Sequence, residues 1–189
     1  MNMGYVISVI IGGLFLISAV VLKNNIFKSS HETTFHLVTN NEIDNIRQII
    51  SHDMRHVGFG RNNEIVQFND STFHFRAAAD GELRDFSWTI LPNGPSGSNP
   101  SLRFLERTGP AHDGTLNQQT YTFTVSHFRV VPFQDELGTV VSTSTEEVRS
   151  IWIELEVMSA EPIGTNSDGT FQYATSRWNK LFRPHNLNI

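Results

Sequence analysis

The first 22 residues constrain this chain more than any other part of it. From Tyr5 to Leu22, 18 consecutive residues carry no charge, and the first charged side chain is that of Lys23. A helix of this length spans roughly 27 Å, close to the hydrocarbon thickness of a bilayer. A secretory signal usually follows a basic stretch and ends at a small-residue cleavage site, and neither flanks this segment. The sequence therefore favours a retained membrane helix over a cleaved signal or a buried helix of a soluble protein.

The helical pattern continues beyond this apolar segment. Apolar residues recur in steps of three and four, the period of one helix face, while the opposite face is polar. Gly58 and Gly60 end the pattern, as glycines just past a helix commonly do. We expect one helix from Tyr5 to Val57, with a possible break around residues 29–34, where Ser-Ser and Thr-Thr are weak helix formers. The residues of the apolar face are Phe35, Val38, Ile43, Ile46, Ile49, Ile50, Met54 and Val57.

After Gly60, the sequence pattern changes from that of a helix to that of β-strands. In IWIELEV, for example, Ile151 and Ile153 alternate with Trp152 and Glu154, which is typical of a strand with one buried face. Turn-rich gaps at 92–100, 108–114 and 163–169 separate such segments. The predicted strands are 64–69, 73–79, 83–91, 101–107, 119–125, 127–133, 148–158 and 170–182.

These patterns predict an α+β fold. Residues 1–57 form a long N-terminal membrane and assembly helix, whose first half is transmembrane. Residues 58–189 form a β-rich head domain, an antiparallel β head packed on the second half of the helix.

Composition and motifs exclude several function classes. The chain has no cysteine, so disulfides, thiol catalysis and cysteine-ligated metals are excluded. A net charge of −5 gives no electrostatic footprint for nucleic acid. No nucleophile elbow, Walker or dinucleotide motif occurs, so we expect no catalytic site and no cofactor. His52 and His56 are four residues apart, but Asp53 replaces the glutamate of the HExxH pattern, and we expect no metal site.

The layout resembles the type IV pilin superfamily. Gly4-Tyr5 is similar to the prepilin processing junction, where a peptidase cuts after glycine and before an aromatic residue. HDMRHVGFG (52–60) resembles a stretch of W-type minor pilins and of J-type pseudopilins of type II secretion, in which Asp53, Arg55 and Gly58 match the motif. We expect Asp53 or Arg55 to reach the β domain as a structural contact. The segments 125–133, 148–157 and 181–187 also resemble the later strands of those proteins.

The resemblance implies a structural role. It predicts a minor pilin or pseudopilin-like subunit of a type IV pilus or type II secretion-like filament, with a single-pass helix in the inner membrane and an extracytoplasmic head. The partners would be other pilin-like subunits, contacted through the N-terminal helix. Gly12 and Gly13 permit close approach of another helix, and Phe27 precedes the head and is assigned to packing between subunits. For Phe35, packing against the chain's own sheet is preferred.

The chain departs from the family pattern at two places. Most members carry a glutamate at the fifth mature position, where it meets the amino terminus of the neighbouring subunit. When counting starts at Tyr5, Val9 occupies this position, so the chain lacks the carboxylate that aligns neighbouring subunits. The usual basic leader is also absent, and cleavage after Gly4 stays open. Two alternatives therefore remain: a single-pass anchored binding protein that acts alone, and a major subunit of a pilin-like filament.

Overall fold

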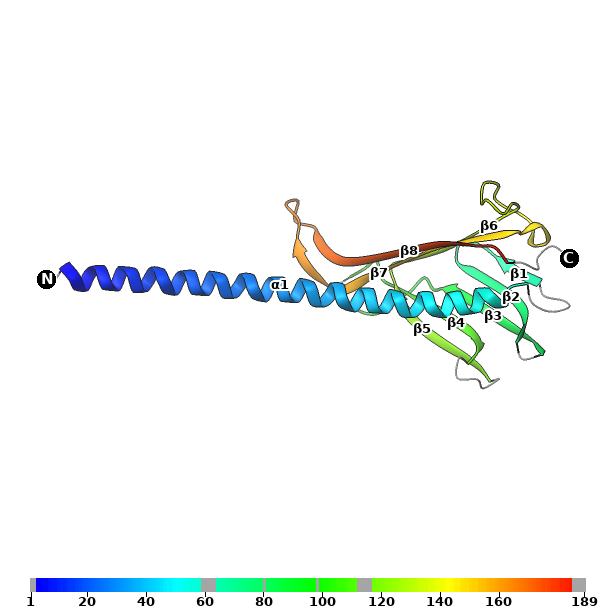
Figure 1. The fold of residues 1–189 in the computed structure, drawn as a ribbon, viewed down its shortest axis with the longest axis horizontal. Helices are drawn as coiled ribbons and strands as arrows, with labels where there is room; N and C mark the ends of the chain where they lie inside the picture. The colour runs from blue at the N-terminus through cyan, green and yellow to red at the C-terminus, as the bar shows by residue number, and fades with distance from the viewer. Residues whose placement is uncertain (1–2, 59–63, 80, 98, 112–116, 185–189) are drawn as a thin grey trace.

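The chain forms one long N-terminal helix followed by an antiparallel β head, as the computed structural model shows for residues 3–58, 64–79, 81–97, 99–111 and 117–184 (Figure 1). The helix projects far beyond the head on its N-terminal side. The α+β fold predicted from the sequence is confirmed.

The helix α1 runs without a break from Met3 to His56. The predicted interruption at 29–34 is wrong. There, the Thr33 and Thr34 hydroxyls donate to the carbonyls of Ser29 and Ser30, at 2.8 Å each, so these hydroxyls are satisfied within the helix. Gly58 has φ of +90°, a left-handed conformation that ends the helix at little cost because glycine lacks a Cβ. Gly60 lies outside the described residues.

The head contains two antiparallel sheets, a division that the sequence analysis did not predict. The five-stranded sheet has the order β1-β2-β3-β4-β5, and the three-stranded sheet has the order β6-β7-β8. A short 3-10 helix, η1 (Thr145–Glu147), lies between β6 and β7. The strands are β1 Glu64–Phe68, β2 Thr72–Ala79, β3 Glu82–Ile90, β4 Arg103–Pro110, β5 Gln118–Val125, β6 His127–Phe133, β7 Ser150–Thr165 and β8 Phe171–Phe182.

Eight predicted strands correspond to these eight, but two boundaries are wrong. β4 extends through Pro110, where we expected a turn, because Gly109 and Pro110 pair with the first residues of β5. β7 extends to Thr165 instead of ending at 158. The ladder between β7 and β8 shifts register around Pro162, and a bulge of this kind accommodates a proline inside a long strand.

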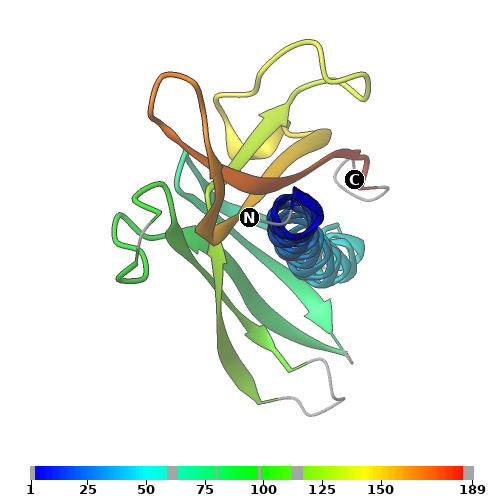
Figure 2. The same cartoon turned by 90° about the vertical axis from the view of Figure 1, so that its left-hand side faces the viewer.

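One hydrophobic core joins the helix to both sheets. Viewed along its axis, α1 lies between the two sheets (Figure 2). Its contacts are chiefly with β7 and β8, and it also touches β2. Val38 is the exception to the predicted apolar face, since it is 53 % exposed, and Phe35 is half-buried. The buried apolar residues that α1 and the turn after it contribute are Ile43, Ile46, Ile50, Met54 and Val57.

Candidate functional site on the exposed half of the helix

The N-terminal half of α1 is an apolar surface on which no other described part of the chain packs. Its large apolar side chains, apart from that of Val6, are more than half exposed, and α1 is long and apolar enough to cross a membrane. Water strongly disfavours this much exposed apolar area, and a bilayer or other apolar helices would cover it. The exposed large residues of this half are Met3, Tyr5, Ile7, Val9, Ile10, Ile11, Leu14, Phe15, Leu16, Ile17, Val20, Val21, Leu22, Ile26 and Phe27.

The residues singled out by the sequence analysis are distributed along this surface. Gly4 and Tyr5 lie in the first turns of α1, at the end farthest from the head, and both are exposed. Val9 is 58 % exposed and Phe27 is 63 % exposed. Figure 1 shows this part of the helix extending away from every strand. Each of these positions is therefore accessible to a partner outside the chain.

Gly12 and Gly13 leave open space around the helix. A Cβ added at either position would meet no atom within 4 Å. The protein's own packing therefore does not require glycine at these positions. A larger side chain would fit the isolated protein, and only a neighbouring molecule would sense it.

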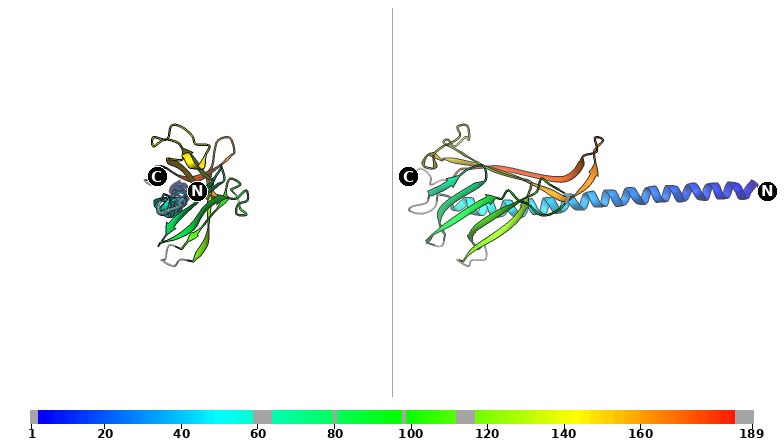
Figure 3. Two further views of the ribbon diagram at one scale, coloured as in Figure 1. Left: turned by 90° about the vertical axis from the view of Figure 1, so that its right-hand side faces the viewer. Right: turned by 180° about the vertical axis from the view of Figure 1, so that it is seen from behind.

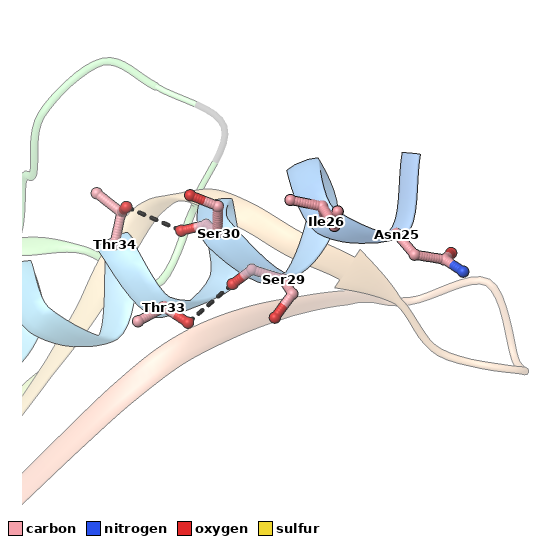
Figure 4. Close-up of a pocket in the computed structure, with 6 residues that line it drawn as sticks. All are labelled: Asn25, Ile26, Ser29, Ser30, Thr33 and Thr34. Atoms are coloured by element: carbon pink, nitrogen blue, oxygen red, sulfur yellow. Dashed lines mark hydrogen bonds between the residues drawn. The ribbon is translucent and has the colours of Figure 1, made fainter. Parts of the chain in front are cut away.

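Residues 23–34, which are polar apart from Ile26 and Phe27, lie on α1 between the apolar segment and the packed half. Lys28 pairs with Glu32 at 3.9 Å across one exposed turn, and the Lys23 ammonium lies 5.5 Å from the centre of the Phe27 ring. A shallow hollow lies on this segment, lined by Asn25, Ile26, Ser29, Ser30, Thr33 and Thr34 (Figure 4). None of these six residues ionises, so the hollow offers no acid or base. The segment is a polar stalk of about 18 Å at 1.5 Å per residue.

The packed half of the helix is held by polar contacts at both of its ends. At the near end, the Ser176 hydroxyl of β8 donates to Thr39 Oγ1 at 3.3 Å and contacts Asn40 Oδ1. At the far end, Asp53 is fully buried and meets β4 and β3. The helix is therefore fixed in both position and rotation relative to the sheets.

The far contact is a buried ion pair. Arg107 donates from Nε to Asp53 Oδ2 at 3.0 Å and from a terminal nitrogen to Oδ1 at 2.8 Å, a bidentate arrangement. The Trp88 indole donates to Asp53 Oδ2 at 3.0 Å. Both charged side chains are almost fully removed from solvent, with 1 % of Arg107 and none of Asp53 exposed. Asp53 thus makes the contact with the β domain, whereas Arg55 is exposed.

The Arg107 guanidinium is enclosed on its other sides as well. Its remaining terminal nitrogen donates to the Pro110 carbonyl at 2.8 Å, and the rings of Phe86 and Tyr121 lie 5.9 and 5.7 Å from its central carbon. Gly109 lies against it, since a Cβ there would lie 3.0 Å from an Arg107 nitrogen. The sequence analysis missed Arg107 and Trp88. A signal was present, because Arg107 shares its strand face with the buried Leu105.

Of the two histidines near Asp53, His56 packs against the sheet, whereas His52 is exposed. His56 stacks on Phe86, with ring centres 5.6 Å apart, and its Nδ1 lies 3.1 Å from the His52 carbonyl oxygen. The two histidine rings lie 4.8 Å apart. Among the described residues, no cluster of three or more histidine, aspartate or glutamate side chains is suited to a metal ion.

Glu42 lies on α1 near the end of the packed half. Burial raises the pKa of its carboxyl above the ordinary 4.5. The folded state therefore holds this proton more tightly than the unfolded chain does. It follows that the charge on Glu42 reduces stability as pH rises from the ordinary value through the raised one.

We expect Glu42→Gln to raise the unfolding temperature of the full-length protein at about pH 7, because the amide removes the desolvated charge. The difference from the wild type should vanish at about pH 3, where both side chains are neutral. Thermal unfolding in detergent across this pH range measures the effect, and Glu32→Gln on the exposed stalk is the matched control. An equal gain at both pH values would contradict the assignment.

We found no match to a protein-family model, to a curated protein or to a solved structure.

Proposed function

We propose that this protein is a minor pilin or pseudopilin-like structural subunit of a type IV pilus or type II secretion-like filament. Its apolar helix is held in the inner membrane before assembly and then packs among the helices of other pilin-like subunits. The head is extracytoplasmic, in the periplasm or at the cell surface. The role is structural and requires no cofactor.

One observation carries the proposal: a single unbroken helix is apolar and exposed in its first half and packed into the head in its second half. Its first half is apolar and exposed all round, whereas its second half is locked into the head by a core seam and a buried ion pair. A simple tether can be flexible. A rigid connection is useful where the orientation of the head must follow that of a packed helix. The resemblance of residues 52–60 to minor pilins and pseudopilins supports the same role, because Asp53 of that stretch forms the buried ion pair with Arg107.

Crosslinking along the helix tests this proposal. The natural chain has no cysteine, so single cysteines at Val9, Leu14 and Phe27 give unambiguous positions. In membranes of the native cell, we expect these cysteines to crosslink to other pilin-like subunits, and an exposed head cysteine at Asp70 serves as control. Recovery of the protein without any helix crosslink would overturn the proposal.

The alternative is an anchored binding protein that acts alone. The observation that favours it is Val9, since an apolar side chain there inserts readily into lipid but offers no charge to a neighbour's amino terminus. The crosslinking experiment separates the two functions, because a lone anchor has no neighbouring helices at these positions.

Processing at the Gly4–Tyr5 bond is a further prediction. Both residues are exposed at the N-terminal end of α1. On co-expression with a prepilin peptidase, we expect mass spectrometry to show loss of Met1–Gly4 and an N-methylated Tyr5. Gly4→Leu should keep the full chain and is the control. Intact Met1 in assembled material would identify an uncleaved anchor instead.

A further inference from the structure

Within the part of the chain that the structure describes, the outer edge of β5 has backbone groups without partners. β5 is the last strand of its sheet and pairs only with β4. Among the described residues, none makes a backbone hydrogen bond to the far side of Gln118–Thr124. Backbone donors and acceptors in a row of this kind form a template for another strand.

The register identifies which groups face outward. The amide of Ala111 donates to the carbonyl of Asn117 at 3.1 Å, and these two residues continue the β4–β5 register in which Arg107 opposes Tyr121. Antiparallel ladders alternate, so the odd-numbered residues of β5 bond inward to β4. The amides and carbonyls of the even-numbered residues point outward, and those of Gln118, Thr120 and Thr122 form the open edge. The C-terminal end of β5 lies against β7, where the Ser126 amide donates to the Glu156 carbonyl at 2.9 Å.

Other sheet edges carry features that block strand addition. η1 packs against β1, and α1 packs against β8, which also carries Arg177 and Lys180. β6 contains Pro132, whose carbonyl accepts from the Ser142 amide at 2.9 Å. β5 has eight residues without charge, proline or bulge. Natural proteins commonly use such features to protect an edge, and among the described residues Gln118–Thr122 of β5 has none of them.

We propose that the edge of β5 binds an extended segment of another extracytoplasmic protein by strand addition. This inference rests on the proposed function for its location outside the cytoplasm. The backbone of the segment bonds to Thr120 and Thr122. Its side chains alternate, with apolar or aromatic residues beside Tyr121 and Phe123 and small polar residues beside the threonines.

The two faces of β5 give this specificity. Tyr121 and Phe123 are half-buried on the core side, where the Phe123 ring lies 6.0 Å from that of Trp88. On the other face, Thr120 is exposed and its hydroxyl lies 3.0 Å from that of Thr108. A bound segment would cover the Tyr121 ring and thereby contact the residues around the Asp53–Arg107 pair.

A second copy of this chain fits the edge poorly. A symmetric antiparallel pair of β5 strands has its two-fold axis perpendicular to the sheet. Because α1 lies along the sheets, that axis would point the two helices in opposite directions (Figure 3). Two copies held in the same membrane cannot adopt this arrangement. Pairing of β5 with a different edge of a second copy is opposed by the features that block those edges, so the occupant is a different protein.

Proline at Thr122 tests the proposal. It removes an amide that faces outward and leaves the bonds of Tyr121 and Phe123 to β4 in place, so the head should fold normally. Full-length protein in native membranes would carry a photocrosslinker on a single cysteine at Thr120. We expect one crosslinked segment of another protein. A synthetic peptide of that segment should bind the detergent-solubilised protein at least tenfold more weakly after Thr122→Pro and unchanged after Thr122→Ala.

Each other outcome overturns the inference. Two of these outcomes are the absence of a crosslink and a crosslink to a second copy of the chain. The third is peptide binding that Thr122→Pro does not weaken, although the unfolding midpoint of the variant equals that of the wild type. The helix cysteines report separately. If they crosslink while the β5 edge does not, only this inference fails. If the edge binds but the helix cysteines find no neighbour, the filament role fails and strand addition stands.

Discussion

Asp53→Ala should destabilise the protein by about 3–5 kcal/mol, the usual result of removing one partner from a buried ion pair. The substitution leaves the Arg107 guanidinium charged, buried and without its carboxylate, and it leaves the Trp88 indole without its acceptor. A domain is stable by only about 5–15 kcal/mol in total. The loss would therefore consume a large share of the stability of the head.

Denaturant unfolding of the full-length protein in detergent, followed by tryptophan fluorescence, measures this loss. Asp44→Ala is the matched control, because Asp44 lies on the same helix and pairs with Arg47 at 3.2 Å on the exposed face. Exposed pairs of this kind contribute about 0–1 kcal/mol. Equal effects of the two substitutions would show that the Asp53 contact does not hold the helix.

A double variant separates the charge from the packing. Asp53→Leu with Arg107→Leu replaces both ions by apolar side chains, a change that is often neutral in buried pairs. We expect it to recover most of the stability lost in Asp53→Ala. If the double variant is less stable than Asp53→Ala, the contribution comes from other contacts of Arg107, such as its bond to the Pro110 carbonyl.

The local patterns of the sequence predicted the elements well. Helical spacing identified Ile43, Ile46, Ile50 and Met54, all of which are buried, and strand alternation identified the buried face of β7. Both are local effects, because a side chain three or four residues along a helix, or two along a strand, returns to the same face. The exposed apolar segment could also be predicted from local sequence, because it is a continuous stretch of uncharged residues.

The long-range pairings could not be read in this way. Arg107 and Asp53 are 54 residues apart, and their meeting depends on the division into two sheets and on the rotation of α1 between them. Val38 was misassigned because spacing extends an apolar face without showing where the head ends. The open edge of β5 likewise depends on strand order, which only the folded topology fixes.

Gly12→Leu or Gly13→Leu should abolish co-purification with partner subunits while leaving membrane insertion intact. Lipid tails are as apolar as leucine, so helices associate in membranes through close packing, in which small residues let two backbones approach. The two glycines are about 100° apart around the helix and thus present different faces. Since the chain leaves open space at both positions, any loss must arise in contact with a neighbour.

Alanine at the same positions is the control. Gly12→Ala and Gly13→Ala also remove the helix penalty of glycine, about 1 kcal/mol each, yet they add only a methyl group. If co-purification survives alanine and fails with leucine, close backbone approach is the cause, and helix flexibility is not. Without a carboxylate at Val9, the proposed assembly would depend on this packing. Crosslinking that recovers the wild type and both leucine variants with the same partners in equal amounts would reject assembly and leave the lone anchor.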